Sequence, residues 1–203
     1  MTIVATDTRS VPVTVIDHRR GSQAMVMFII TEAVLFLVFF FAYYYLGHDA
    51  PKWPTELPKL PLALTMLVLL LASSVVLYMG EEAGKKGEFA RAKAWTAGTV
   101  LMGAVFLSLQ TLEYREHLKT LRPTDNAYGS IFYTITSFHA AHLVLGLLML
   151  IYVLILPSPQ LGKAEKPPHH SLHNAALYWH FVDIVWLFIV GLLYVAPHLT
   201  GQS

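Results

Sequence analysis

The sequence has no cysteine among its 203 residues, which excludes disulfide bonds, thiolate metal ligands and cysteine nucleophiles. Charge is also scarce, because charged residues make up 13% of the chain. That is roughly half of the share, about 25%, that is typical of soluble domains. The net charge is +1 with neutral histidine and the basic residues form no patch, so no nucleic-acid partner is indicated. Apolar residues are abundant at 55%, and a membrane protein is therefore the first class to test.

Five apolar segments are long enough to cross a bilayer, whose hydrocarbon core of about 30 Å needs roughly 20 helical residues. They cover residues 25–46, 60–80, 94–112, 131–156 and 175–196. The connections are rich in proline, glycine or charge, and the second, 81–93, reads as a charged loop. We therefore predict an all-α polytopic membrane protein, one bundle of five transmembrane helices within residues 25–203.

Residues 1–24 are polar and lack the apolar core of a cleaved signal peptide, so we expect them to form a cytoplasmic tail. The distribution of Lys and Arg supports this orientation. Of the 14 basic residues, nine lie in the tail and in the second and fourth connections, on one side of the predicted bundle. Because cytoplasmic loops carry an excess of Lys and Arg, we expect the N-terminus in the cytoplasm and the C-terminus outside.

The last apolar segment carries most of its polar groups in one stripe. At 100° per residue, Trp179, His180, Asp183, Trp186 and Tyr194 fall within an arc of about 120°. A charged side chain facing lipid costs roughly 2.5–3.5 kcal/mol on insertion scales. We therefore expect this stripe to face other helices and the opposite Val, Ile, Leu and Phe side chains to face lipid.

Three other segments carry polar candidates. His139, His142 and Gly146 share one face of the fourth segment, and Gly allows helices to approach closely. Glu113 lies near the end of the third segment. Glu32 is the single acid of the first, and its apolar surroundings predict that it is protonated or strongly hydrogen-bonded.

Each candidate has a structural and a functional interpretation. His180 and Asp183, three residues apart on a helix, can form a structural hydrogen-bonded pair or handle protons or a ligand. His139 and His142 can bond between helices or ligate a metal. Glu113 can be buried or simply solvated at the outer interface. A lone carboxyl inside a membrane, such as Glu32, is a functional candidate by default.

A haem-binding membrane anchor is one alternative. His139 and His142 share a helix face, so they cannot sandwich one haem. With a rise of 1.5 Å per residue, His142 and His180 differ in depth by roughly 6 Å, which fits a shared haem poorly. A small transporter is a further alternative, although no inverted repeat supports it.

The motifs LYWHFVDIVWLFIVGLLYV, SFHAAHLVLGLLML, FIITEAVLFLVFFFAYY and LASSVVLYMG with SLQTLEY, in their order along the chain, resemble subunit III of the haem-copper oxidases. The resemblance covers about residues 25–196. The larger members of that family have seven helices, and this chain resembles the shorter five-helix bacterial form.

The resemblance implies a non-redox subunit of a respiratory terminal oxidase, most simply a cytochrome c oxidase, in a bacterial inner membrane. It implies no cofactor bound by this chain, haem and copper in partner subunits, contact with subunit I and subunit II, and bound phospholipid. Glu32 would support proton uptake or lipid contact. Trp179, Trp186 and Gly146 would pack the helices, with structural polar links at the remaining sites: Glu113, His139, His142, His180 and Asp183. A quinol oxidase or a nitric oxide reductase remains an alternative complex.

Overall fold

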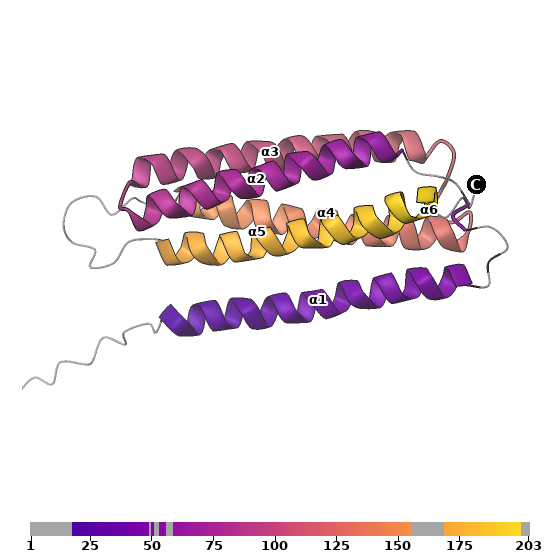
Figure 1. Cartoon of the computed structure of the whole chain (residues 1–203), viewed down its shortest axis with the longest axis horizontal. Helices are drawn as coiled ribbons and strands as arrows, with labels where there is room; N and C mark the ends of the chain where they lie inside the picture. The colour runs from indigo at the N-terminus through magenta and orange to yellow at the C-terminus, as the bar shows by residue number, and fades with distance from the viewer. Residues whose placement is uncertain (1–17, 49, 51–52, 56–58, 156–168, 200–203) are drawn as a thin grey trace, which may run out of the picture.

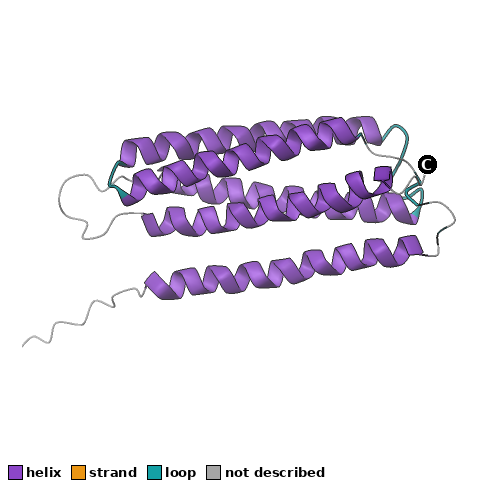
Figure 2. Ribbon diagram, in the orientation of Figure 1, coloured by secondary structure: helices purple, strands orange, loops and turns teal. Residues whose placement is uncertain are grey.

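The computed structural model describes residues 18–48, 50, 53–55, 59–155 and 169–199, and all regular structure in these ranges is helical (Figures 1 and 2). Five helical stretches are long and apolar enough to cross a membrane, which confirms the predicted class. The elements are α1 (His18–His48), α2 (Leu60–Lys85), α3 (Phe89–His117), α4 (Ala127–Ile155), α5 (His169–Ile189), the π-helical segment η1 (Val190–Val195) and α6 (Ala196–Leu199).

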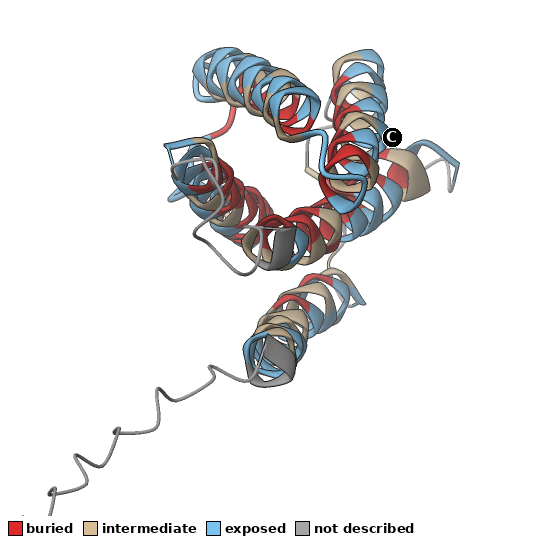
Figure 3. Cartoon of the chain, turned by 90° about the vertical axis from the view of Figure 1, so that its left-hand side faces the viewer, coloured by how far each residue is buried: buried red, intermediate tan, exposed pale blue. Residues whose placement is uncertain are grey.

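Helices α2, α3, α4 and α5 form a closed ring, in which each packs against two neighbours. Helix α1 lies outside this ring and packs on the side formed by α4 and α5 (Figure 3). Only 6% of the most apolar window of α1 is buried, compared with 50% for the last span. The core is therefore the interior of the four-helix ring, and α1 is an added element. We call the end where α1, α3 and α5 begin the near end, and the opposite end the far end.

Helices α2 and α3 are joined by a tighter turn than the sequence suggested. The charged stretch 81–93 was expected to be a loop, but helix covers all of it except residues 86–88. Gly87 adopts a φ of 79°, and the N–H groups of Gly87 and Glu88 donate to Gly84 O at 3.1 Å and to Ala83 O at 2.9 Å. This pattern is a Schellman motif, in which N–H groups that follow the helix satisfy its last free carbonyl groups.

Three other helices also begin earlier than predicted, and one of them is α5, which starts at His169 instead of about residue 175. Helix α4 starts at Ala127 instead of about residue 131, because Asn126 Oδ1 accepts a hydrogen bond from Gly129 N–H at 2.7 Å and caps the first turn. Helix α1 starts at His18, so the end of the predicted polar tail 1–24 is helical. Residues 1–17 of that tail lie outside the described residues.

The last span contains a wide turn, η1, immediately before Pro197. Proline has no N–H for the carbonyl of Leu193, and its ring clashes with that carbonyl in a regular α-helix. A wider turn removes the conflict. In this turn the N–H of Ala196 donates to Gly191 O, instead of to Leu192 O as in a regular α-helix. The segment keeps Val190, Leu193 and Tyr194 buried inside the bundle.

Trp179 is one of the two largest fully buried side chains inside the ring, the other being Trp186. Its indole N–H donates to Ser73 Oγ at 3.0 Å, which links α5 to α2. Its ring lies where α3 and α4 both carry glycine. A Cβ added at Gly103 would stand 2.6 Å from the Trp179 ring, and one added at Gly146 would stand 3.1 Å from it. The two glycines therefore make the space that a central tryptophan needs.

This packing predicts that Gly103→Ala destabilises the protein. The added methyl would also meet Leu147 at 2.8 Å, and a rigid indole cannot move aside cheaply. We expect a loss of about 1–3 kcal/mol, the usual range for overpacking, measured by thermal unfolding in detergent. Gly98→Ala on the same helix is the matched control, because its nearest neighbour would be Val76 at 3.4 Å. Equal stability of the two variants would contradict this view of the core.

Candidate functional site

The polar stripe of α5 faces α2, and its partner there is a serine pair. Ser74 Oγ lies 2.8 Å from His180 Nδ1 and donates to Asp183 Oδ2. Because the Ser74 hydroxyl donates to the carboxylate, it accepts from the His180 N–H. His180 and Asp183 were expected to bond each other, but in the described residues Ser74 stands between them. Ser73 and Ser74 were not predicted as partners of this stripe, although two adjacent serines in an apolar run are a visible signal.

The apolar side of α5 lies opposite this stripe. Ile184, Leu187 and Phe188 are each 50% exposed or more, whereas Asp183 is 4% exposed and Trp186 is fully buried. Trp186 packs edge-on against Phe106 of α3, with ring centroids 5.0 Å apart. The division of α5 into a polar inward face and an apolar outward face therefore agrees with the expectation from the sequence.

The polar residues of α4 contact three different helices. Thr136 Oγ1 accepts a hydrogen bond from Tyr114 of α3 at 2.6 Å. His139, fully buried, donates through Nε2 to Val182 O of α5 at 3.2 Å. His142 Nε2 lies 2.9 Å from Glu32 Oε2 of α1. The shared face of this helix thus makes interhelical hydrogen bonds, and α4 is the element that holds α3, α5 and α1 together.

The hydrogen-bond geometry of Glu32 and His142 indicates a single proton between the two side chains. His142 Nδ1 donates to the carbonyl of Phe138 at 2.7 Å, so this nitrogen carries a hydrogen. The short contact of Nε2 with Glu32 then requires either a protonated carboxyl that donates to a neutral ring or a charged ring that donates to a carboxylate. Both arrangements contain one proton between the two groups. The expectation that Glu32 is protonated or strongly hydrogen-bonded agrees with this geometry.

The Glu32–His142 pair is also less enclosed than the links at Asp183 and Glu113 inside the ring, whose carboxyl residues are 4% and 2% exposed. The side chains of Glu32 and His142 are 21% and 12% exposed. A second link between α1 and the ring, Ser22 Oγ to Asn174 Oδ1 at 3.0 Å, lies closer to the near end. Both links join α1 to the side of the ring that α4 and α5 form.

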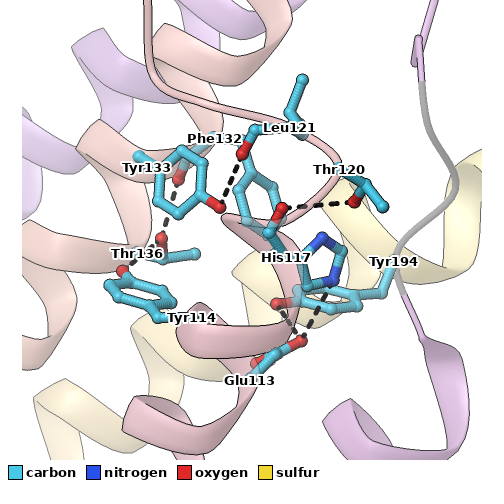
Figure 4. Close-up of polar contacts among 9 residues, drawn as sticks. All are labelled: Glu113, Tyr114, His117, Thr120, Leu121, Phe132, Tyr133, Thr136 and Tyr194. Carbon is cyan, nitrogen blue, oxygen red and sulfur yellow. Dashed lines mark hydrogen bonds and ion pairs between the residues drawn. The ribbon is translucent and has the colours of Figure 1, made fainter.

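Glu113 belongs to a buried cluster at the far end (Figure 4). It is 2% exposed, so Glu113 does not face bulk solvent at the outer interface. The hydroxyl of Tyr194, brought inward by η1, donates to Glu113 Oε1 at 3.0 Å, and His117 Nε2 lies 4.0 Å from the same oxygen. Beside them the hydroxyl of Tyr133 donates to Leu121 O at 3.1 Å and holds the α3–α4 connection against the bundle.

One further pair lies at the near end and was not predicted. His173 Nδ1 of α5 lies 2.9 Å from Glu81 Oε1 of α2. It is separated from the Ser74–His180 contact by two helical turns, or about 10 Å. The signal in the sequence was their equal spacing, since Glu81 follows Ser74 and His173 precedes His180 by the same number of residues on antiparallel helices.

The histidines of the spans that had raised the haem alternative are thus occupied by protein groups. His139 bonds a backbone carbonyl, His142 a carboxyl and His180 a serine. Across residues 18–48, 50, 53–55, 59–155 and 169–199 no group of three or more His, Asp or Glu side chains gathers to hold a metal ion.

The fold and these contacts define a polytopic helical membrane protein whose polar side chains join helices. Comparison with known proteins gives the family. Residues 13–197 match the family model described as cytochrome c oxidase subunit III. The chain is 37% identical over 174 residues to cytochrome c oxidase subunit 3 of Synechocystis sp., which covers 84% of this chain and 73% of that protein.

Two further relatives agree. The cytochrome c oxidase subunit 3 of Thermostichus vulcanus is 34% identical over 84% of this chain and 85% of its own length. The probable cytochrome c oxidase subunit 3 of Nocardia farcinica is 36% identical over 80% of this chain and 79% of its own length. The chain belongs to the cytochrome c oxidase subunit III family. The resemblance seen in the motifs is thereby confirmed.

The α2–α5 contact predicts the effect of removing one hydroxyl. Ser74→Ala would leave Asp183 buried without its partner, because the second carboxyl oxygen, Oδ1, has no hydrogen-bond partner in the described part of the chain. An unsatisfied buried group costs about 1–3 kcal/mol, and we expect that loss in thermal unfolding.

Ser108→Ala is the matched control for this variant. Ser108 is exposed and bonds the carbonyl of Ala104 in its own helix, so its removal should change stability little. A Ser74→Ala protein as stable as the Ser108→Ala protein would show that the hydroxyl does not stabilise the buried aspartate.

Proposed function

We propose that this chain is the non-redox subunit III of a respiratory haem-copper terminal oxidase, most simply a cytochrome c oxidase. In this role it stabilises subunit I and supports proton uptake during oxygen reduction and proton translocation. Haem and copper would lie in the partner subunits, which include subunit II. The family membership supports the complex, and the 2.9 Å contact between Glu32 Oε2 and His142 Nε2 is the observation that supports a role in proton supply.

The position of the pair favours function over a purely structural link. The structural contacts of the ring, at Ser74–Asp183 and Tyr194–Glu113, surround carboxyl groups that are 4% exposed or less. Glu32 keeps 21% of its side chain exposed on the side of the bundle where α1 lies. A proton held there can exchange with a neighbouring subunit or with groups at the membrane surface, whereas a proton on Asp183 is enclosed.

The exposed surface of α1, on the same side of the bundle, supports a contact with lipid. Helix α1 exposes a series of large apolar side chains to the surroundings, with Met27, Phe41, Tyr44 and Tyr45 each more than two-thirds exposed. The tyrosines lie at the far end of α1, where aromatic side chains anchor helices at a membrane interface. We propose that phospholipid covers this surface next to Glu32, in a bacterial inner membrane with the N-terminus in the cytoplasm and the C-terminus outside.

Glu32→Gln tests the proton role. The amide keeps the size of the side chain and can still bond His142, so assembly should be intact. It cannot release a proton. We expect slower proton uptake by the oxidase complex, or a shorter working life during turnover, by a factor of several. Stopped-flow proton uptake and the decay of oxygen consumption in reconstituted vesicles measure the two effects.

Two further variants make this test specific. His142→Gln removes the other partner of the shared proton and should give the same defect. Glu82→Gln is the control, because Glu82 lies at the near end of α2 and pairs with Lys85 in solvent-exposed surroundings. Unchanged turnover and inactivation rates in the Glu32→Gln complex would rule out this role.

A further inference from the structure

Gln110 is a buried amide in the interior of the ring with unused hydrogen-bonding capacity. It lies on α3 one turn before Glu113 and is 3% exposed. Neither its amide oxygen nor its amide nitrogen has a hydrogen-bond partner among the residues that the structure describes, and the same holds for Glu113 Oε2. Buried polar side chains nearly always have a partner, so these three atoms together call for an explanation.

The three atoms belong to one place. Residues three apart on a helix have Cβ atoms about 5–6 Å apart on the same face, so the Gln110 amide and the Glu113 carboxyl are neighbours. Tyr194 already occupies Glu113 Oε1. Oε2 is therefore the oxygen left for a group between the two side chains. No direct hydrogen bond joins the two side chains in the described residues, so their unused polar atoms are left for a small molecule that bonds both.

The surroundings enclose this place. One turn before Gln110 on α3 lies Phe106, fully buried and packed against Trp186 of α5. On the far-end side lie Tyr194 and His117, whose ring packs against Phe132 of α4 with centroids 5.6 Å apart (Figure 4). The π-helical segment η1 is what brings Tyr194 to this position, and π-helical turns are frequent at functional sites.

We propose that Gln110 and Glu113 bind one or two water molecules inside the bundle. A water molecule can accept from the Gln110 Nε2–H and donate to Glu113 Oε2, and a second can donate to Gln110 Oε1. Buried waters typically make about three hydrogen bonds to groups of this kind. A metal ion does not fit, because the only carboxylate here is Glu113 and the described residues hold no cluster of three ligating side chains.

The bound water makes the far end of the bundle a polar binding site that does not involve Glu32. It makes Glu113 a hydrated carboxyl whose hydrogen-bond chain runs from Tyr194 of η1 to Gln110 of α3, across the interior of the ring. The wide turn, the tyrosine and the glutamine then act as one unit that binds a polar ligand between α3 and the last span. This inference does not depend on the proposed proton role of Glu32.

Infrared spectroscopy of the complete chain in lipid nanodiscs tests the proposal. Bound internal water gives O–H stretching bands that shift when the solvent is changed to water labelled with oxygen-18. We expect such a band in the wild type and its loss in Gln110→Leu. Gln23→Leu, on the exposed side of α1, is the matched control and should keep the band. Gln110→Met, an unbranched substitute of similar length, repeats the test if the leucine variant does not fold.

Thermal unfolding supplies the second measurement. Without bound water, replacing an unsatisfied amide by an apolar side chain should raise the melting temperature. With bound water the replacement strands Glu113 Oε2, and we expect a decrease of about 2–4 °C. A Gln110→Leu or Gln110→Met protein that retains the labelled band, or that melts at a higher temperature than the wild type, overturns the proposal.

Discussion

The constraint on which this structure depends is that the interior of a membrane offers a polar side chain no water to bond. A buried carboxyl, hydroxyl or imidazole in the spans therefore needs a partner within the protein, and the partners that lie on another helix help to decide which helices meet. Ser74 between His180 and Asp183 joins α2 to α5, Tyr194 and Glu113 join the last span to α3, and His139 joins α4 to α5. Apolar packing alone would not select these neighbours, because lipid tails are as apolar as leucine. The four-helix ring is the arrangement that satisfies them together.

Helix α1 follows the same rule with fewer contacts, and the difference bears on function. It lies outside the ring, and within the span its acid meets the bundle through His142. Phe36 is the deeply buried anchor beside this pair, with its ring centroid 5.0 Å from that of His142. The proposed proton role needs a carboxyl at the edge of the bundle, whereas Asp183 and Glu113 are enclosed inside the ring. One chemical group thus serves as a structural link in the ring and as a proposed proton carrier at its border.

Much of the fold could be predicted from the sequence, because hydropathy determines which segments span a membrane and helical periodicity determines the polar face of each. The stripe of Trp179, Asp183 and Trp186 is an example. Periodicity predicts which face of a helix is polar but not which residue of another helix packs against that face. Ser74 was therefore not predicted as the partner of His180 and Asp183. Helix ends were misplaced where a local cap acts, at Gly87 and Asn126. The burial of Glu113 could not be predicted from its position near a helix end, because the residues that bury it come from distant parts of the chain. Tyr194 is one of them. Pro197 was a usable signal for the wide turn.

Helix α5 turns its polar stripe toward protein, and we expect its apolar face to contact lipid. The absence of cysteine makes a direct measurement simple, since a single introduced cysteine carries the only spin label in the chain. Labels placed one at a time from residue 179 to residue 192 in nanodiscs report collisions with oxygen, which is concentrated among the acyl chains. The structure predicts oxygen accessibility that peaks at residues 184, 187, 188 and 192 and falls to a minimum at 179, 183 and 186. A maximum at 180 and 183, or no periodicity along the helix, would contradict it.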